Sequence, residues 1–524
     1  MSEYKWSEVG KEDDLREGEP VSVEVDGVKV LVVRLADGIH ACGGKCTHYG
    51  GPLDEGLLVG NVVRCPWHSA RFDVTTGKME SPPALDDVGC CDVKVEDGVV
   101  YVTAPREEQP PAVEGEDDRT FVMVGAGAAG NAAAETLRRE GFAGRIVLVT
   151  AESVLPYDRP TLSKEFMAGE AKPEWLPLHD AGFYDDWGIE LMTGRRVAGI
   201  DPAERVIEFE DGDQLSFDKA LLATGATPRN LDIPGADLEG YFLLRSRADA
   251  EGINAALEGA ETAVIIGASF IGMEVGWGLR QRGLDVHVVA PENVPMSRIF
   301  GEAVGKWLHE KHEEAGVQFH LGTAPEEVRG NGAAEEVLLS NGQTLPADLV
   351  VAGVGVRPAV GFLEGSGLLR DGVVPVDATL QTEAEDIYAA GDIALVPSHY
   401  TGESHRIEHW IVAERQGQHA ARAMLGSDEL YKEIPFFWTH QADASITHIG
   451  YPGETDEVIV RGEVGDGEWL IGFYANGRLR AAACKWMDRE ILSLMELMKA
   501  GKEIPADVLA DPDTDLVGML ETVG

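Results

Sequence analysis

Hydrophobic and polar positions alternate in short runs along the first hundred or so residues. The runs 21–25 and 28–35 have the length and β-branched content of strands, and the Asp-Gly pair between them is a typical hairpin turn. A second pair of runs, 92–95 and 99–102, flanks another Asp-Gly turn. This part of the chain is expected to form an all-β domain.

A different pattern follows position 118: an apolar run, a glycine-rich turn and a helical run. Residues 121–124 lead into the turn 125–130, and residues 264–266 lead into the similar turn 267–272. Strands that alternate with helices in this way predict doubly wound α/β domains.

The final part of the chain combines the strand-like runs 457–461 and 469–474 with a helical run at 488–499. It predicts an α+β domain. The expected fold class is therefore multidomain, with an all-β domain first, two doubly wound α/β domains next and an α+β domain last.

Composition bounds the setting of the protein. The 524 residues are enough for several cores, and 44% hydrophobic residues are typical of globular proteins. No apolar run is long enough for a membrane span, and the N-terminus lacks the apolar core of a signal peptide. Six cysteines do not form a disulfide framework in so long a chain, so a reducing, cytoplasmic location is expected.

The net charge of −47 is the most unusual bulk property. It argues against nucleic acid or anionic lipid as a partner, because both would repel the chain. Two interpretations stay open: a solvated acidic surface of the kind found in high-salt organisms, and a surface that docks a basic electron acceptor.

Four residues in two short loops predict an iron–sulfur site. The ligand pairs are Cys46 with His48 and Cys65 with His68, in the pattern C-x-H and C-x-x-H. Two thiolates on one iron and two imidazoles on the other are the ligands of a Rieske [2Fe–2S] cluster. A Cys2His2 zinc site is the alternative, but zinc sites more often begin C-x-x-C.

These loops resemble those of Rieske-type ferredoxins more than those of respiratory Rieske proteins. The respiratory family has a disulfide where this chain has Gly51 and Trp67, and hydroxyl side chains where it has Ala70 and Phe72. Fewer hydrogen bonds to the cluster sulfurs imply a potential low in the Rieske range. The other four cysteines are expected to be buried thiols.

The two glycine-rich turns predict dinucleotide sites. Gly125, Gly127 and Gly130 follow a strand and open a helix, where backbone amides can approach a pyrophosphate. Glu152 follows the next strand, where an acid can bind an adenosine ribose. The second turn departs from this pattern, because Ser269 stands at its middle glycine position.

Five further motifs carry a family resemblance over nearly the whole chain. They lie at residues 155–164, 221–225, 387–392, 406–410 and 436–438. Together they resemble the NADH-dependent ferredoxin reductases of oxygenase systems and the apoptosis-inducing factor family. With the Rieske segment included, the chain resembles the apoptosis-inducing factor-like proteins.

The resemblance implies roles for individual residues. Lys164 and Glu274 match a buried ion pair beside the reactive flavin nitrogen, and they are the expected catalytic residues. Asp392 would hold the ribityl chain of FAD, and Glu408 would lie near the nicotinamide. The remaining residues expected to bind FAD or NADH are Arg159, Val197, Thr224, Gly225, Arg245, Gly267, Phe270, Ile271, Gly272, Glu292, Gly355, His409, Trp410 and Trp438.

NADH is expected rather than NADPH. Ala290 stands where the family often has a ribose-binding Glu, with Glu292 two residues later, and no basic residue follows the strand directly to bind a 2′-phosphate. No C-x-x-x-x-C pair follows the first glycine turn, so a redox disulfide is not expected.

The expected function is transfer of electrons from NADH through FAD to the Rieske cluster, because a flavin can accept two electrons and release one at a time. The final acceptor is expected to be an external one-electron acceptor: an oxygenase, a ferredoxin or a cytochrome. The alternative is an NADH-responsive redox sensor in which turnover is incidental. A homodimer is possible under either hypothesis. The expected domains are Rieske (1–105), a linker (106–117), FAD-binding (118–246 and 373–433), NAD(P)H-binding (247–372) and a C-terminal interface-type domain (434–524).

Overall fold

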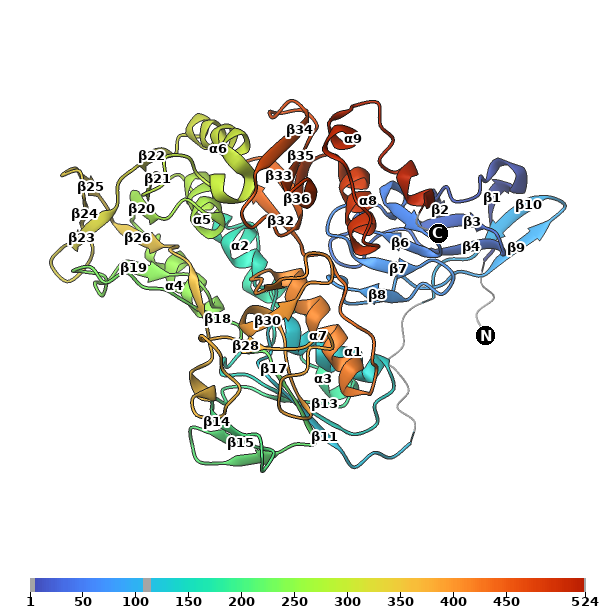
Figure 1. Ribbon diagram of the computed structural model, residues 1–524, viewed down its shortest axis with the longest axis horizontal. Helices are drawn as coiled ribbons and strands as arrows, with labels where there is room; N and C mark the ends of the chain where they lie inside the picture. Colours follow the sequence, from blue (N-terminus) through green and yellow to red (C-terminus); the bar gives the residue numbers. More distant parts are fainter. Residues whose placement is uncertain (1–4, 107–114, 523–524) are drawn as a thin grey trace.

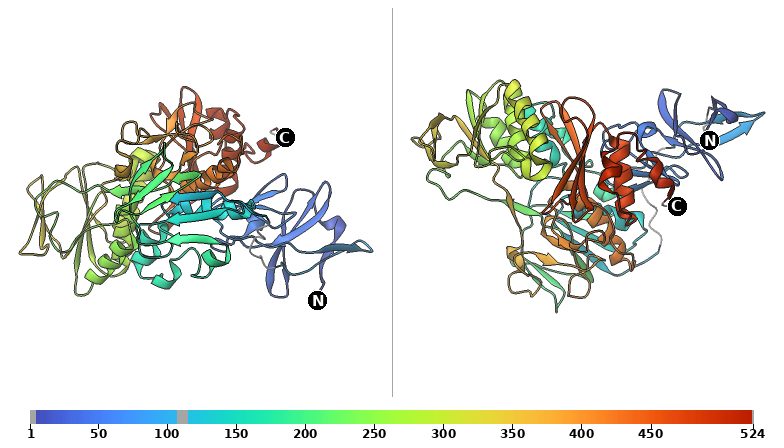
Figure 2. Two further views of the ribbon diagram at one scale, coloured as in Figure 1. Left: turned by 90° about the horizontal axis from the view of Figure 1, so that it is seen from below. Right: turned by 45° about the horizontal axis from the view of Figure 1, so that its top comes forward.

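The computed structural model describes residues 5–106 and 115–522. The N-terminal domain and the α/β domain that contains β20 lie at opposite ends of the molecule (Figures 1 and 2). The α/β domain that contains β11 and the C-terminal domain lie between them. Most of the linker expected at 106–117 falls outside the described residues.

The N-terminal domain is built from three small antiparallel sheets. Their strand orders are β1-β10-β9, β2-β3-β4 and β5-β6-β7-β8. The strands are β1 (Ser7–Lys11), β2 (Val21–Val25), β3 (Val28–Leu35), β4 (Gly38–Gly43), β5 (Leu57–Val59), β6 (Val62–Arg64), β7 (Arg71–Asp73), β8 (Met79–Ser81), β9 (Val93–Glu96) and β10 (Val99–Val102). The alternating run at β3 gives an apolar core on both sides, because Leu31 and Val33 face one cluster and Val30 and Val32 the other.

The first α/β domain has a five-stranded parallel sheet in the order β13-β12-β11-β17-β29. Its strands are β11 (Thr120–Val124), β12 (Arg145–Val149), β13 (Ile189–Met192), β17 (Lys219–Leu222) and β29 (Ile387–Ala389). Helices α1 (Ala128–Arg139) and α7 (Trp410–Met424) pack closely, since a Cβ at Gly417 would lie 2.0 Å from the carbonyl oxygen of Ala129. A small antiparallel sheet, β14 (Val197–Asp201), β15 (Val206–Phe209) and β16 (Gln214–Ser216), extends the domain.

The second α/β domain repeats this plan in the order β19-β26-β20-β21-β22. The strands are β19 (Tyr241–Leu243), β20 (Thr262–Ile266), β21 (Asp285–Ala290), β22 (Gln318–Leu321) and β26 (Leu349–Ala352), with helices α4 (Arg247–Ala256), α5 (Phe270–Gln281) and α6 (Ser297–Glu314). The antiparallel sheet β23 (Pro325–Arg329), β24 (Glu336–Leu339) and β25 (Thr344–Pro346) lies beside it. Strands β18 (Ala226–Pro228) and β27 (Val356–Pro358) pair where the chain passes between the two domains.

The C-terminal domain is an antiparallel sheet in the order β32-β33-β36-β35-β34, with helices α8 (Asp488–Lys499) and α9 (Ala506–Ala510). The strands are β32 (Phe436–Gln441), β33 (Ala444–Gly450), β34 (Glu457–Gly462), β35 (Trp469–Ala475) and β36 (Arg478–Lys485). The remaining α-helices and sheet strands are short. They are helices α2 (Glu165–Ala168) and α3 (Phe183–Asp186) and the small sheet of β28 (Val374–Pro375), β30 (Ala394–Pro397) and β31 (Ser404–His405).

The expected fold class is confirmed. Strands β2 and β3 and helix α8 begin and end at the predicted residues. Within residues 5–106 and 115–522, none of the helices combines the length and apolar character needed to cross a bilayer. The expectation of buried thiols holds for Cys42, Cys91 and Cys484, whereas Cys90 is only half-buried.

Candidate functional site

A cavity of about 1370 Å³ lies along the carboxyl ends of the two parallel sheets. From the first sheet it is lined by Gly125 after β11, Glu152 after β12, Thr224 after β17 and Asp392 after β29. The second sheet contributes Ser269 after β20 and Gly355 after β26. Ligands of doubly wound α/β domains bind at this edge of the sheet.

The first glycine turn fits a pyrophosphate. Gly125 has φ +111°, and a Cβ there would lie 2.3 Å from the carbonyl oxygen of Ala223. A Cβ at Gly130 would lie 1.8 Å from the oxygen of Gly125, so this glycine lets α1 approach the strand. At Gly127 a Cβ would meet nothing within 4 Å, so the backbone faces open space at the start of α1. These positions leave room for a phosphate at the helix N-terminus.

Charged side chains along the first sheet are already paired. The guanidinium of Arg159 donates to Glu152 at 3.0 Å, and the hydroxyl of Tyr157 donates to the same carboxylate at 2.8 Å. Arg245 donates to Asp392 at 2.8 Å. The polar lining beside the glycine turn suits the ribose and ribityl hydroxyls of FAD, so the residues present fit this cofactor.

Lys164 and Glu274 form an ion pair with an Nζ–Oε2 distance of 3.0 Å. Their side chains are 13% and 4% exposed, so little solvent screens the pair. Glu274 also accepts hydrogen bonds from Ser163 at 2.6 Å and from Thr439 at 2.7 Å. These contacts fix the carboxylate from η3 (Pro160–Ser163) and β32, two elements far apart in the chain.

The second glycine turn is as tight as the first. A Cβ at Gly272 would lie 2.0 Å from the oxygen of Gly267, and a Cβ at Gly267 would lie 2.4 Å from the oxygen of Gly353. Ser269 stands before α5 with an extended backbone, and its side chain makes no capping hydrogen bond. Its side chain lines the cavity in the place where the first turn has Gly127.

Aromatic side chains close the end of the cavity. Trp410 begins α7, Trp438 lies on β32, and both line the wall. His409 stacks on Phe437 with 4.1 Å between ring centroids, and burial lowers the pKa of His409 to about 4. The imidazole is therefore neutral at neutral pH, and the stack is an uncharged wall.

The structure brings most of the expected cofactor-binding residues to this one cavity. Those that line it are Gly125, Gly127, Glu152, Arg159, Lys164, Val197, Thr224, Gly225, Arg245, Ser269, Phe270, Ile271, Glu274, Gly355, Asp392, Glu408, His409, Trp410 and Trp438. Gly130, Gly267 and Gly272 lie behind the lining as packing positions, and Glu292 is also outside it, 3.7 Å from Arg298.

The two cluster loops have equivalent backbones. Cys46 N–H donates to the oxygen of Gly51 and Cys65 N–H to that of Ala70, at 2.9 and 2.8 Å. The oxygen of each cysteine also accepts from the residue four positions later, at 2.9 and 3.0 Å. The loops meet at Gly51, where a Cβ would lie 2.7 Å from Cys65 Sγ.

The four candidate ligands lie as a cysteine pair and a histidine pair. The Sγ atoms of Cys46 and Cys65 are in hydrogen-bonding contact, and the Nδ1 atoms of His48 and His68 are 3.0 Å apart. A Rieske cluster divides its ligands in this way, thiolates on one iron and imidazoles on the other. The donor set and its pairing therefore fit a [2Fe–2S] group.

The histidine side of this site contacts the C-terminal domain and the first α/β domain. The ring centroids of His68 and Trp438 are 4.1 Å apart, and those of His48 and Trp438 are 6.0 Å apart. The hydroxyl of Tyr49, next to His48, donates to Asp158 at 2.6 Å. Trp438 also lines the large cavity, so one indole lies between the two candidate cofactor sites.

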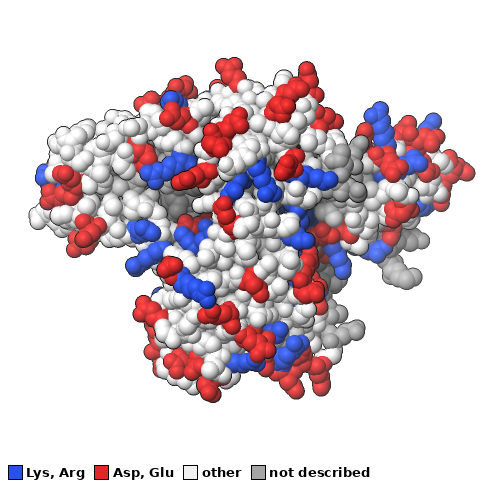
Figure 3. Space-filling view, in the orientation of Figure 1, with Lys and Arg blue, Asp and Glu red and all other residues white. Residues whose placement is uncertain are grey.

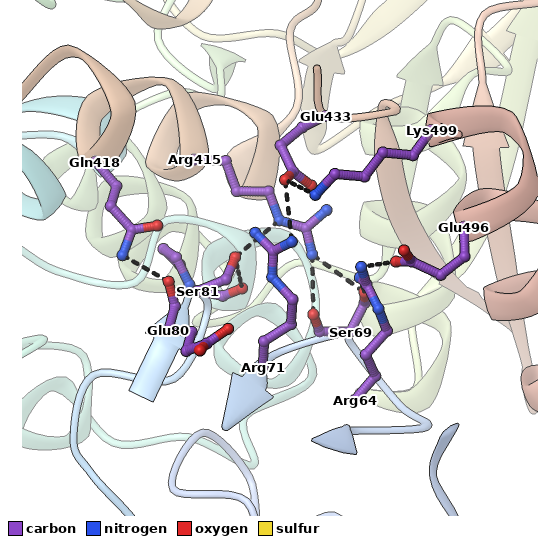
Figure 4. A network of polar contacts seen from close by, with 11 residues as sticks. Arg64, Ser69, Arg71, Glu80, Ser81, Arg415, Gln418, Glu433, Glu496 and Lys499 are labelled. Atoms are coloured by element: carbon purple, nitrogen blue, oxygen red, sulfur yellow. Dashed lines mark hydrogen bonds and ion pairs between the residues drawn. The ribbon is translucent and has the colours of Figure 1, made fainter. Parts of the chain in front are cut away.

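A buried polar network holds the N-terminal domain against α7 and the C-terminal domain (Figure 4). Arg415 of α7 donates to the oxygen of Ser69 at 2.9 Å, directly after His68 in sequence. Glu433 pairs with Arg71 at 3.0 Å and with Lys499 at 2.6 Å. Arg64 pairs with Glu496 on α8, and Gln418 donates to the oxygen of Glu80 at 2.9 Å.

Sequence reasoning did not find this network. Its hydrogen bonds and ion pairs across the interface join residues at least 334 positions apart, so no local spacing relates them. Sequence reasoning also missed Ser163 and Thr439, although it named their neighbours Lys164 and Trp438 as candidate site residues. The available signal was the run of charged and amide residues Glu414-Arg415-Gln416, which directly follows the apolar run 410–413.

Three family models match the chain. They are the Rieske [2Fe-2S] domain over residues 5–92, pyridine nucleotide-disulphide oxidoreductase over 119–417 and reductase C-terminal over 436–520. The protein is a nicotinamide-dependent flavin reductase with a Rieske domain on the same chain. It belongs to the pyridine nucleotide-disulphide oxidoreductase family.

Individual proteins are similar to this chain in sequence or in structure. The chain is 36% identical to Apoptosis-inducing factor 3 of Homo sapiens over 94% of its own length and 83% of that protein. It is 35% identical to the ferredoxin–NAD(+) reductase component of the anthranilate 1,2-dioxygenase system of Burkholderia cepacia, over 76% of this chain and 98% of that one. The covalent putidaredoxin reductase–putidaredoxin complex superposes with a TM-score of 0.73 at 28% identity, covering 78% of this chain and 99% of that one.

Proposed function

We propose that this protein oxidises NADH and passes the electrons through FAD and its own Rieske cluster to an external one-electron acceptor. The observation that carries the proposal is the position of Trp438. Its indole lines the large cavity and lies 4.1 Å from the ring of His68, a candidate cluster ligand. Two redox sites on one chain are therefore separated by a single side chain.

Bound FAD would supply the conversion between hydride transfer and single-electron transfer. The residues of this chain bind and orient the reactants. The glycine turn at 125–130 would hold the FAD pyrophosphate, and Asp392 and Glu152 would accept hydrogen bonds from its hydroxyl groups. Trp410 and Trp438 would pack against the ring system and exclude water.

Lys164 and Glu274 are proposed to set the electrostatic field at the place where hydride charge arrives. The pair is buried and hydrogen-bonded on both carboxylate oxygens, so its charges are held in fixed positions before the reaction. Charges held in place in a water-poor site stabilise a transition state more than mobile charges in solvent do.

NADH is proposed as the donor. Ala290 at the end of β21 is fully buried, so no side chain there contacts the adenosine ribose. Glu292 is the nearest acid after that strand and would accept the ribose hydroxyls. Stopped-flow reduction by NADH and NADPH compares the two donors, and faster reduction by NADPH would contradict this assignment.

The acceptor is proposed to be a small redox protein or oxygenase. The relative from Burkholderia cepacia is the reductase component of an oxygenase system, and putidaredoxin forms a complex with its reductase. In this protein a Rieske domain stands on the same chain as the reductase. A cytochrome is a further candidate, and a cytoplasmic location and a homodimer remain parts of the proposal.

Removal of the Rieske domain tests the electron path. Residues 118–524 correspond to relatives that consist almost wholly of this part, so the fragment is expected to fold and bind FAD. It should reduce ferricyanide with NADH at a rate close to that of the whole chain, because a small oxidant takes electrons directly from the flavin. It should largely lose reduction of cytochrome c. Equal cytochrome c rates in both proteins would remove the cluster from the path and favour the redox-sensor hypothesis.

A further inference from the structure

A second cavity, of about 380 Å³, opens beside the cluster loops. Three parts of the chain line it: the N-terminal domain with Trp67 and His68, the first α/β domain with Glu165, and the C-terminal domain with Trp438 and Trp486. One wall is thus a candidate cluster ligand, and another is the indole that separates this cavity from the larger one.

Large aromatic side chains stand exposed around this opening. The exposed fractions are 53% for Tyr49, 45% for Trp67 and 59% for Trp486. Exposed aromatic side chains that gather in one place mark interaction sites, and Trp and Tyr are the residues most often found at the energetic centre of such sites. We call Tyr49, Trp67 and Trp486 the aromatic rim.

The aromatic rim is also the approach to the cluster. Trp67 lies between the ligands Cys65 and His68, and Tyr49 directly follows the ligand His48. The buried network of Figure 4 holds this domain against α7 and α8. A partner that covers the rim would therefore contact the residues directly next to the candidate ligands His48 and His68 without moving the domain.

Carboxylates surround the rim. Glu165 and Asp488 line the cavity, and Glu55 and Glu490 lie close enough to Asp488 to act on its pKa. Lys164, the lysine in the lining, is already paired with Glu274. Arg489 is an exposed cation beside these acids, and the ammonium of Lys485 lies 3.5 Å from the ring centroid of Trp486. The rim is therefore apolar at its centre and mainly acidic around it, as the net charge of −47 leads one to expect.

We infer that the aromatic rim is the docking surface for a small one-electron carrier protein with a basic contact face. The inference rests on the proposed function, because it takes the cluster to be the exit for electrons. Aromatic anchors would supply contact area at the centre, and the surrounding carboxylates would attract and orient a basic partner. A one-electron carrier matches a [2Fe–2S] group, which releases electrons singly.

The test uses the full-length holoprotein with cytochrome c as a basic probe and ferricyanide as a small control oxidant. In Trp67→Ser and in Trp486→Ser the KM for cytochrome c should rise roughly tenfold or more, in line with the loss of an aromatic hot spot. Ferricyanide reduction should be unchanged. The matched control is Trp6→Ser, which truncates another tryptophan, 39% exposed and directly before β1 in the sequence. Figure 1 shows β1 at the far tip of the same domain.

Charge variants test the partner class. In the double variant Glu165→Gln, Asp488→Asn the KM for cytochrome c should rise several-fold at low salt, and the difference should shrink at high salt because salt screens the attraction. An acidic ferredoxin used as the oxidant should show the opposite change. A lower KM for cytochrome c in this variant would overturn the inference of a basic partner.

Other outcomes distinguish a failure of the docking surface from a failure of the proposed function. Trp486 lies on the reductase side, so its variant should keep the Rieske EPR signal even if Trp67→Ser disturbs the loop. An unchanged KM for cytochrome c in Trp486→Ser, with that signal intact, overturns the docking surface. A change from dimer to monomer by sedimentation would make the rim a self-association face and also overturns it. Failure of the proposed function shows differently, as rapid cytochrome c reduction by residues 118–524 alone.

Discussion

At the scale of single residues, the Lys164–Glu274 pair shows how burial gives a common ion pair a special role. An exposed ion pair contributes little to stability, because solvent screens its charges and both side chains stay mobile. This pair is almost wholly buried, and Ser163 and Thr439 donate to the two oxygens of the carboxylate. Its geometry is therefore set before any cofactor arrives.

Glu274→Gln should slow reduction of the flavin by NADH by roughly ten- to a hundredfold, because it removes a fixed negative charge that holds Lys164 in place. Stopped-flow bleaching of the flavin at saturating NADH measures the rate. Glu165→Gln, next to Lys164 but exposed, is the matched control and should keep the normal rate. An unchanged rate in Glu274→Gln would refute the proposed role of the pair.

Cys46→Ser and His68→Ala should each lose the iron–sulfur cluster and keep FAD, because the two sites share no ligands. The unmodified protein should contain two irons and two labile sulfides per chain and one FAD. Metal analysis, sulfide assay and the flavin spectrum measure these contents. Stoichiometric zinc in place of iron would instead support the Cys2His2 alternative.

At the scale of elements, the contact between the Rieske domain, α7 and α8 depends on buried charge. Burial alone would raise the pKa of Glu433, but Arg71, Lys499, Arg415 and Arg64 together hold it well below the usual value. The carboxylate is therefore ionised in the folded protein, and its partners depend on it for compensation. Removal of one member of such a network leaves the others as uncompensated buried charges.

Glu433→Gln should lower the free energy of unfolding by about 3 kcal/mol at pH 7, since it leaves Arg71 and Lys499 without a carboxylate. A matched control is Glu383→Gln, which breaks the exposed pair with Arg370, with 59% and 68% of the side chains exposed, and should cost less than about 1 kcal/mol. Urea unfolding followed by tryptophan fluorescence measures both. Equal effects in the two variants would contradict a stabilising role for the buried network.

The pH dependence of this difference follows from the lowered pKa of Glu433. A carboxyl group with a folded-state pKa below its unfolded value of about 4.3 contributes stability that is fully present above that value. The contribution is lost as pH falls toward the folded-state pKa. The gap between the unmodified protein and Glu433→Gln should therefore stay constant from pH 7 to about 5 and narrow below about pH 4.

At the scale of the whole molecule, the most unusual property is the acidic surface. Figure 3 shows Asp and Glu side chains spread over every part of the visible face. With 91 acidic and 44 basic residues, repulsion between carboxylates outweighs their attraction to cations in the molecule as a whole. The salt response distinguishes the two interpretations of this surface.

If the acidic surface reflects adaptation to high salt, the melting temperature should rise from low salt to molar NaCl, because screening relieves the repulsion between carboxylates. Thermal unfolding at a series of NaCl concentrations measures the trend. A flat or falling melting temperature would leave the docking of a basic partner as the better explanation of the charge.

The sequence alone determined the features that depend on neighbours along the chain. The strands at 21–25 and 28–35 follow from the alternation of apolar and polar residues. The turn at 125–130 follows from its glycines, because a Cβ at Gly125 or Gly130 would collide with neighbouring backbone atoms. The candidate cluster ligands lie within two short loops, so their spacing was enough to propose them, and their role stays a prediction. The Lys164–Glu274 pair is 110 positions apart and was recognised only through the family resemblance.

Only the tertiary structure decided how the two redox sites meet. Trp438 was predicted to pack around the flavin, and nothing near it in sequence placed it also against His68, because that contact spans the chain from one domain to another. The same holds for Arg415 with Ser69 and for Glu433 with Arg71, 346 and 362 residues apart. Residue spacing encodes local geometry through the backbone, whereas a contact between domains depends on how whole surfaces pack.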